Sequence, residues 1–279
     1  MDSRRNRHIQ RYGWDLAVDA YEAFWLEQLA PAQATLLDLA RLAPGERVLD
    51  VACGTGFATF AAALSVGPGG EAVGVDLSGR MIDAARRRAD VRRVANARFE
   101  RMDAERLDLP GATFDAALCL QGLMYFSDPV RALREMRRAL RPGGRLAVSA
   151  WGEPSRCGLD SAFAIVRAEM PGDLHPGFVG MGQGDALAGA CAEAGFAKVE
   201  ACRIPATLAF ADEDEACDAA FTGGPVALAW SRLDDTARWR LRRRYIEAIA
   251  PWRHGRRYRI PAEFVVAAAE APGLTPFPI

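Results

Sequence analysis

The chain has 279 residues, half of them apolar, which is enough to bury a sizeable core in one large domain or two small ones. Its 35 lysines and arginines are balanced by 36 acidic residues. This near-neutral charge offers no basic field to a phosphate backbone, so we expect no nucleic-acid partner. Because no apolar stretch approaches the thickness of a bilayer, we expect no membrane span and a cytoplasmic location.

The six cysteines are scattered singly, with no Cys-x-x-Cys pair and no histidine at ligand spacing. Such cysteines are typical of small core side chains in the reduced state. The sequence therefore predicts neither a disulfide framework nor a metal site.

Residues 1–45 predict a helical segment that caps the rest of the fold. Trp14, Tyr21 and Trp25 recur at helical spacing and so share one face of a first helix. Pro31 suits the first turn of a second helix, because a backbone N–H at that position has no helical partner to lose.

Between residues 46 and 155 apolar strands alternate with helices, and the predicted strands are 47–53, 71–77, 97–102, 114–120 and 145–151. Ser78 suits the cap of the helix after the second strand, and Asp128 followed by Pro129 suits the start of the helix before the fifth. Parallel strands joined by such crossover helices form a sheet that is covered on both faces.

Beyond residue 155 the predicted order is a lid loop with a helix (156–182), a core helix and strand (183–210), a helical lid insertion (211–259), and a final core strand with a tail (260–279). The two further strands bring the total to seven. The predicted fold class is therefore α/β, a Rossmann-like, mostly parallel seven-stranded sheet with helices on both faces, an N-terminal helical segment and a helical lid insertion.

The most informative stretch is VLDVACGTG, residues 48–56, where an acid within the first strand precedes a Gly-x-Gly turn. Ligands of open α/β sheets bind at the carboxyl ends of the strands. Gly54 and Gly56 let the backbone approach a ligand closely, and the helix that begins near Phe57 offers free N–H groups. The turn therefore indicates a ligand site, although a Gly-x-Gly alone is equally typical of a structural turn.

Acids accompany three of the predicted strands. Asp50 lies inside the first strand, Asp76 ends the second, twenty residues beyond Gly56, and Asp103 follows the third. At its position Asp76 can accept hydrogen bonds from both hydroxyls of a ribose, and Asp103 is within reach of an exocyclic amine on adenine. Three strand ends with suitable ligand groups favour a nucleoside cofactor.

A nicotinamide-dependent oxidoreductase is the main alternative, and two features disfavour it. The dinucleotide fingerprint has a third glycine where this chain has Thr59, and no Tyr-x-x-x-Lys pair is present. Asp50 would also place a carboxylate beside a pyrophosphate, whereas it would stabilise a cofactor with a cationic amine and a sulfonium. A protein that binds a nucleoside cofactor without turnover is a further alternative.

In this order and spacing, the motifs VLDVACGTG, GVDLS, MDAERLDLP, FDAALCLQGLMYF and ALRPGGRL resemble those of class I S-adenosylmethionine-dependent methyltransferases. The resemblance covers residues 21–151 and is strongest to the branch that includes the ubiquinone/menaquinone C-methyltransferases and many small-molecule enzymes. It implies an enzyme that uses S-adenosyl-L-methionine as cofactor and a small molecule as methyl acceptor.

The same resemblance implies a set of cofactor-binding residues. The loop that follows Asp50 would hold the methionine moiety, Asp76 the ribose, and Gln121 would lie beside the transferred methyl group. Leu77 and Met81 would pack on the adenine. The full set is Tyr21, Asp50, Ala52, Cys53, Gly54, Gly56, Asp76, Leu77, Met81, Asp103, Ala104 and Gln121.

No general base follows from the resemblance, because residues 123–126 stand where many relatives have a histidine pair. Methyl transfer from a sulfonium is an in-line displacement with an activated donor, so positioning and exclusion of water can provide much of the catalysis. The candidate catalytic residues are Tyr125, which would orient an acceptor hydroxyl, and His175, which would act as a base in the lid loop.

The acceptor is expected to be an aromatic, polyketide-like or isoprenoid-like small molecule. The side chains that can wall its pocket are the N-terminal aromatic residues, residues 124–126, Phe178, Met181, Trp230 and Trp239. The end of the fourth strand has neither an Asn/Asp-Pro-Pro-aromatic run for nucleobase methylation nor clustered carboxylates for magnesium. The sequence leaves open the accepting atom (O, C, N or S) and whether the protein is a homodimer.

Overall fold

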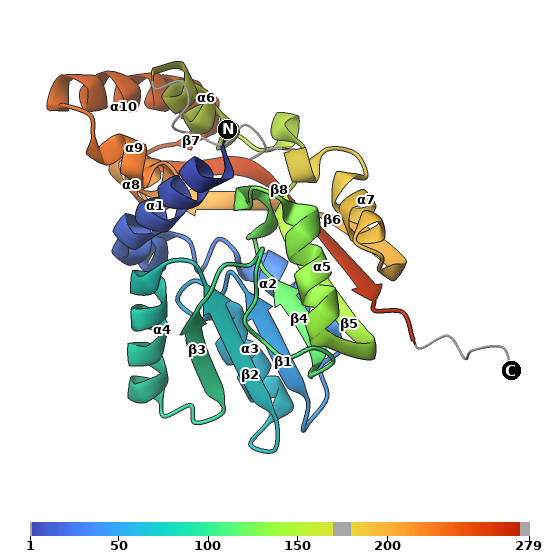
Figure 1. The fold of residues 1–279 in the computed structure, drawn as a ribbon. Coiled ribbons are helices and arrows are strands. Elements are labelled where there is room, and N and C mark those ends of the chain that lie inside the picture. Colours follow the sequence, from blue (N-terminus) through green and yellow to red (C-terminus); the bar gives the residue numbers. More distant parts are fainter. Residues whose placement is uncertain (1, 170–179, 274–279) are drawn as a thin grey trace, which may run out of the picture.

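The computed structural model, which describes residues 2–169 and 180–273, has one sheet with helices on both of its faces (Figure 1). Seven strands follow one another in the order β3-β2-β1-β4-β5-β8-β6, and a two-residue strand, β7, pairs with β8. Strands β1 to β5 run parallel, whereas β8 is antiparallel to β5 and β6. The predicted α/β fold class is confirmed.

The strands are β1 (Arg47–Val51), β2 (Glu71–Asp76), β3 (Ala97–Arg101), β4 (Phe114–Cys119), β5 (Leu140–Trp151), β6 (Ala197–Phe210), β7 (Arg253–His254) and β8 (Arg257–Glu270). The α-helices are α1 (Ser3–Phe24), α2 (Ala30–Ala40), α3 (Phe57–Val66), α4 (Gly79–Arg92), α5 (Pro129–Ala139), α6 (Asp160–Glu169), α7 (Ala186–Glu193), α8 (Glu213–Thr222), α9 (Ala227–Ser231) and α10 (Asp235–Ile249). Short 3-10 turns are η1 (Leu123–Tyr125), η2 (Pro154–Arg156) and η4 (Ala250–Trp252).

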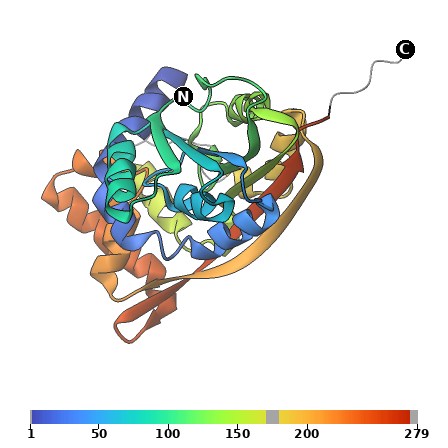
Figure 2. The same ribbon diagram turned by 90° about the horizontal axis from the view of Figure 1, so that it is seen from below.

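The helices form three groups around the sheet. Helices α2, α3 and α4 pack on one face and α5 and α7 on the other, as the view from below shows (Figure 2). The third group, α1, α6, α8, α9 and α10, lies above the carboxyl ends of the parallel strands (Figure 1). None of the helices within the described residues is both long enough and apolar enough to cross a membrane.

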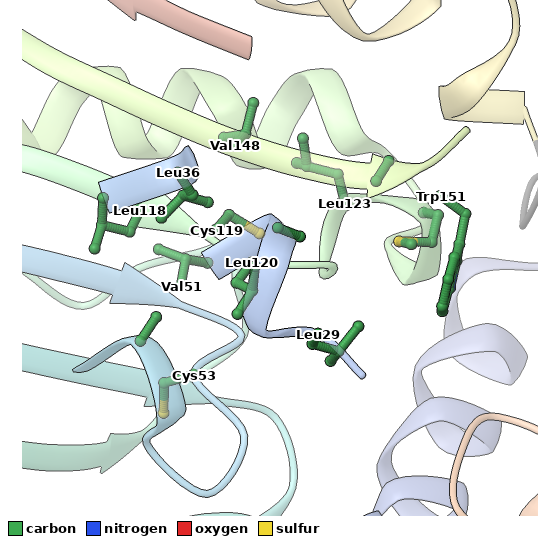
Figure 3. Close-up of a cluster of buried hydrophobic side chains, with 14 of the residues drawn as sticks. Leu29, Leu36, Val51, Cys53, Leu118, Cys119, Leu120, Leu123, Val148 and Trp151 are labelled. Carbon is green, nitrogen blue, oxygen red and sulfur yellow. The ribbon is translucent and has the colours of Figure 1, made fainter. Parts of the chain in front are cut away.

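Large apolar side chains from neighbouring strands form the core beneath the strand ends. Val51, Leu118 and Val148 come from β1, β4 and β5, and they cluster with Leu36 of α2 (Figure 3). All four are fully buried, and each such side chain contributes about 1.5–3 kcal/mol through the hydrophobic effect. The cluster continues to Trp151 at the end of β5. The strand ends therefore project from a tightly packed base.

Three element boundaries differ from those that the sequence pattern indicates. Helix α1 begins at Ser3, well before its periodic aromatic residues, because the Asp2 side chain accepts a hydrogen bond from the Arg4 amide and caps it. Strand β5 begins at residue 140, since Leu140 pairs with Phe114 of β4 before an irregularity, after which regular pairing resumes at Arg145. Strand β8 begins at residue 257, inside the predicted insertion, because its first residues pair with the end of β6.

Candidate active site

A pocket lies at the carboxyl ends of the parallel strands, between the sheet and the helices above it. Its walls are the segments that follow β1 to β5, together with side chains from α1, α6 and the end of α8. Tyr125, a candidate catalytic residue, is among the lining residues. Nine of the twelve predicted cofactor-binding residues line it as well, namely Tyr21, Ala52, Gly54, Asp76, Leu77, Met81, Asp103, Ala104 and Gln121.

The loop after β1 has backbone angles that few residues adopt. Ala52, Gly54 and Gly56 have positive φ angles of 58°, 55° and 89°. A Cβ atom at Gly56 would lie 2.7 Å from Phe60 Cε2, so the helix packs too closely for any side chain there. Ala52 and Gly54 line the pocket, whereas Gly56 and the buried Cys53 shape the loop without lining it. A non-glycine residue held at positive φ, such as Ala52, is typical of functional sites.

Asp76 ends β2 at the pocket wall. Its carboxylate accepts hydrogen bonds from the backbone N–H groups of Gly54, at 2.9 Å, and of Ser78, at 2.8 Å. Burial raises the pKa of Asp76 to about 6, although these hydrogen bonds oppose the shift. Each carboxylate oxygen accepts one of these two bonds and can accept more, so Asp76 has capacity for two ligand hydroxyls.

Asp50 does not reach the pocket surface, which differs from the expectation that three carboxylates converge there. It is fully buried inside β1, and its carboxylate accepts a hydrogen bond of 2.6 Å from the Thr59 hydroxyl on α3. Burial, together with the nearby charge of Asp76, raises the pKa of Asp50 to about 7. The reason for the difference is its position: Asp50 lies within the strand rather than at its tip.

The segments after β2 and β3 form an apolar slot with an acid at its edge. Leu77, Met81 and Met102 line the slot, and Asp103 lies beside them. Helix α1 covers this end, because Arg7 makes ion pairs of 3.7 Å with Asp103 and 3.5 Å with the buried Glu105. No other lysine or arginine among the described residues lines the pocket.

Gln121 follows β4 with a φ angle of 57°, which is unusual for a residue with a side chain. Its backbone N–H and its amide Nε2 both donate to the hydroxyl of Ser149 on β5, each at 3.1 Å. Its Oε1 atom is buried and has no hydrogen-bond partner in the described part of the chain. Buried polar atoms without partners are rare in folded proteins, so a bound ligand is the expected partner.

Three aromatic side chains form the next part of the wall. The ring of Trp14 meets Tyr21 and Tyr125 edge-on, with centroid distances of 5.7 Å and 5.2 Å. Burial raises the pKa of Tyr125 well above its ordinary value. Tyr125 is therefore a neutral phenol near pH 7, which makes it a hydrogen-bonding group and not a strong base.

The far half of the pocket is apolar and comes from segments that are distant in the sequence. Its walls are Trp25, Leu29, Trp151, Leu159, Phe163, Ala219, Ala220 and residues 223–225. The indole of Trp25 is fixed, because its Nε1 donates to the Ala219 carbonyl at 3.1 Å. A Cβ atom at Gly223 would lie 2.6 Å from that same nitrogen, so only glycine fits against the ring.

Sequence reasoning missed most of this far half. Ala219, Ala220 and Gly223 carry no chemical signal of their own, and Trp151 reads as an ordinary strand residue. Helix α1 also contributes Asn6 and Gln10 to the pocket, and the helical spacing of these two with Trp14 and Tyr21 is the signal that could have identified them.

Two predicted wall residues lie away from the pocket, and two further predicted residues fall outside the part of the chain that the structure describes. The expectation for Trp239 is wrong, because its side chain is 58% exposed on α10, and Trp230 stacks on Phe221 outside the pocket. His175 and Phe178 lie outside the described residues. Within residues 2–169 and 180–273, no group of three or more metal-ligating side chains is found.

Fold and pocket together define a Rossmann-like domain with a pocket at the strand ends. The YcgJ protein from Bacillus subtilis has this fold, with a TM-score of 0.60 at 19% identity over 87% of this chain and 99% of that one. Phosphoethanolamine N-methyltransferase 2 of Haemonchus contortus, solved with S-adenosyl-L-methionine, has a TM-score of 0.59 at 18% identity over 92% of this chain and 57% of that one. At such identities these similarities establish the fold alone.

Sequence comparison supports the family resemblance. Residues 42–171 match a family model described as a methyltransferase domain. The chain is 34% identical to the aklanonic acid methyltransferase DauC of Streptomyces sp. (strain C5), over 52% of this chain and 66% of that protein. It is 41% identical to the ubiquinone/menaquinone biosynthesis C-methyltransferase UbiE of Ectopseudomonas mendocina (strain ymp), over 42% of this chain and 46% of that protein. Residues 42–171 therefore match a methyltransferase domain, and the matches support the resemblance of the motifs to the class I S-adenosylmethionine-dependent methyltransferases.

The matches cover part of each relative. The chain spans about half the length of the curated relatives that it matches, from 39% to 66%. S-adenosylmethionine is the cofactor of the class, and the pocket fits it: Asp76 can bind ribose hydroxyls, and the buried Gln121 Oε1 atom lacks a donor within the described ranges. The negative potential of Asp76 and Asp103 also suits a cationic ligand.

Proposed function

We propose that the chain transfers a methyl group from S-adenosylmethionine to a small, planar, apolar acceptor bound in the same pocket. The observation that carries this proposal is that one pocket has two unlike halves. Asp76, Asp103 and the strained loop after β1 form one half, and Trp25, Trp151 and the small residues at the end of α8 form the other. A polar nucleoside and an apolar acceptor would therefore meet between them, near Gln121.

The polar half supports a specific assignment of roles. Asp76 would bind the ribose hydroxyls, because each of its carboxylate oxygens accepts one backbone hydrogen bond and can accept another. Leu77 and Met81 would pack on the adenine faces, and Asp103 with the backbone of Ala104 would meet the adenine edge. The loop around Gly54 would lie against the methionine part, since it turns at positive φ where the backbone can approach closely.

When bound, the cofactor supplies a methyl group on a positively charged sulfur, already activated for displacement. The residues of the chain then need to bind, align and dehydrate the reactants. The aromatic and aliphatic walls of the far half exclude water, and Trp25 is held in place by its bond to Ala219. A rigid wall of this kind stabilises one orientation of a flat acceptor.

No strong base is among the described residues that line the pocket. Tyr125 has a raised pKa and stays protonated, so its phenol would orient an acceptor hydroxyl or carbonyl by hydrogen bonding. His8 and His254 are exposed and lie outside the pocket. His175 stays a prediction. The proposed mechanism therefore depends on an acceptor atom that is nucleophilic without prior deprotonation, or that loses its proton after transfer.

Two kinds of relative support a small-molecule acceptor. One is named for aklanonic acid and several are named for ubiquinone/menaquinone biosynthesis. The apolar walls around Trp25 and Phe163 independently favour a flat ring system. An aromatic or quinone-like acceptor is therefore the proposed class.

The test is a transfer assay with S-adenosylmethionine that carries a labelled methyl group. The purified chain would be incubated with a panel of planar aromatic hydroxy compounds and quinols, and with small amines of similar size as controls. We expect label in one or more planar acceptors and equimolar S-adenosylhomocysteine. Cofactor binding without transfer to any compound would favour a non-catalytic binding protein, and binding of a nicotinamide cofactor instead would favour the oxidoreductase.

A further inference from the structure

Ser149 is a buried polar residue in β5 to which nothing above assigns a function. Its side chain is fully buried, and β5 lies next to β4 in the sheet. The hydroxyl oxygen accepts two hydrogen bonds of 3.1 Å, one from the backbone N–H and one from the side-chain Nε2 of Gln121. One hydroxyl therefore holds both the backbone N–H and the side-chain amide of Gln121, which restricts the side-chain rotamers.

This arrangement fixes what Gln121 presents to the pocket. Because Nε2 is bound to Ser149, the Oε1 atom is left as a hydrogen-bond acceptor. The residue is only 7% exposed and lines the pocket, and Oε1 has no partner among residues 2–169 and 180–273. A buried carbonyl oxygen without a donor destabilises the ligand-free protein, so a ligand with an N–H or O–H group at this point would be favoured.

The surroundings indicate a cationic donor. Gln121 borders the loop after β1, because a Cβ atom at the adjacent Gly122 would lie 2.7 Å from Ala52 Cβ. Asp76 holds the same loop through Gly54, and no lysine or arginine from the described segments lines this part of the pocket. A positively charged donor beside the loop would be stabilised by the carboxylate, whereas a second acceptor would be repelled.

We propose that Ser149 is a positioning residue whose hydroxyl holds the Gln121 amide so that Oε1 accepts a hydrogen bond from the α-ammonium group of S-adenosylmethionine. This inference rests on the proposed function, because it requires the methionine part of the cofactor to lie against the loop after β1. Ser149 itself touches neither reactant. It acts only through Gln121.

The test compares two ligands that differ at the methionine end. S-adenosylhomocysteine has the ammonium group, whereas 5′-methylthioadenosine keeps the adenosine and the thioether and lacks the amino-acid part. For Ser149→Ala we expect the dissociation constant of S-adenosylhomocysteine to rise about five- to tenfold, less than the full effect of one hydrogen bond to a charged group, because Gln121 is loosened and not removed. The dissociation constant of 5′-methylthioadenosine should stay within about twofold. Isothermal titration calorimetry measures both.

A double-mutant cycle shows whether Ser149 acts through Gln121. Gln121→Met removes the amide oxygen at similar side-chain length, and we expect Ser149→Ala to add nothing in that background. Ser65→Ala is the matched control, since it removes an exposed hydroxyl that bonds to the Ala61 carbonyl on α3, away from the pocket. If Ser149→Ala fails to fold, Gln121→Met alone must weaken S-adenosylhomocysteine and spare 5′-methylthioadenosine.

The outcomes separate this inference from the function on which it rests. Equal weakening of both ligands, unchanged affinity for both, or additive effects in the cycle would overturn the role of Ser149 while the wild-type protein still binds the cofactor. Failure of the wild-type protein to bind S-adenosylhomocysteine would overturn the proposed function itself.

Discussion

The two halves of the pocket are built in different ways. The cofactor half comes from the ends of β1 to β4, where Gly54, Asp76 and Asp103 lie within one continuous third of the sequence. The acceptor half joins Trp25 from the N-terminal segment, Trp151 from β5 and Ala220 from α8, which are far apart in the chain. The first half follows from local pattern, whereas the second depends on how distant helices dock.

The halves also differ in how their polar groups are satisfied. In the cofactor half, Asp76 accepts backbone N–H groups, and the Oε1 atom of Gln121 is without a donor from the described residues. In the acceptor half, the Trp25 indole already donates to the Ala219 carbonyl. The cofactor half therefore favours a polar ligand, whereas the acceptor half offers an apolar surface on which the indole N–H is already paired. The predictions below separate the two.

The largest effect is expected at Asp76. Asp76→Asn should weaken the binding of S-adenosylhomocysteine by about 1–3 kcal/mol, roughly five- to 150-fold, because charge-assisted hydrogen bonds to the ribose are lost. Calorimetry measures the dissociation constant. Asp83→Asn on the exposed face of α4 is the matched control and should leave it unchanged. An unaltered affinity in Asp76→Asn would remove Asp76 from the site.

Filling the acceptor half should impair use of the acceptor and leave cofactor binding nearly unchanged. Ala220 is buried and lines the pocket, so Ala220→Leu adds volume where the flat acceptor would lie. We expect kcat/KM for the acceptor to fall about tenfold or more, with the affinity for S-adenosylhomocysteine within about twofold, and a modest loss of stability from overpacking. Ala192→Leu on the exposed side of α7 is the control. Equal losses for both ligands would show that the halves are not separate.

The buried acids predict a pH dependence. The pKa of Asp50 is raised to about 7 and that of Asp76 to about 6, mainly by burial, so both are partly protonated in the ligand-free protein near pH 6. Since the ribose hydroxyls and the ammonium group of S-adenosylhomocysteine favour the ionised carboxylates, affinity for this ligand should rise about three- to fivefold between pH 5.5 and 8, with proton release. Calorimetry in buffers of different ionisation enthalpy measures both the affinity and the number of protons released.

The same shift has a consequence for stability. A carboxyl group whose folded pKa is raised favours folding below its unfolded pKa, and this contribution is lost as the pH rises through about 7 for Asp50. Ligand-free Asp50→Asn, which cannot ionise, should therefore gain stability relative to wild type as the pH rises from about 4 to about 7. If the unfolding free energies of wild type and Asp50→Asn changed with pH in parallel, the raised pKa of Asp50 would be contradicted.

The smallest effect is expected at the edge of the cofactor half. Arg7 joins α1 to Asp103 and Glu105 through ion pairs that are partly exposed. Such pairs are worth about 0.2–1 kcal/mol, so Arg7→Ala should change the affinity for S-adenosylhomocysteine by less than about fivefold. Arg4→Ala, on the exposed first turn of α1, is the control. A loss as large as that of Asp76→Asn would mean that Arg7 contacts the cofactor directly.

How much the sequence could predict follows the same division. The strands, the Gly54 turn and Asp76 were predictable, because a buried strand followed by glycine or an acid is a local pattern. Asp50 was expected at the pocket surface but bonds to Thr59 beneath it, since the strand pattern does not fix which group a buried carboxylate meets. Gly223 could not be predicted, because its importance comes only from its contact with Trp25.

The central claim is that adenosine binds at the strand ends and leaves the apolar half free for the acceptor. A crystal structure of the complex with S-adenosylhomocysteine tests it most directly. The account predicts the ribose hydroxyls on Asp76, the adenine between Leu77 and Met81, and the thioether sulfur facing the cavity beside Trp25 and Trp151. Adenosine density in the apolar half, or a ribose with no contact to Asp76, would contradict it.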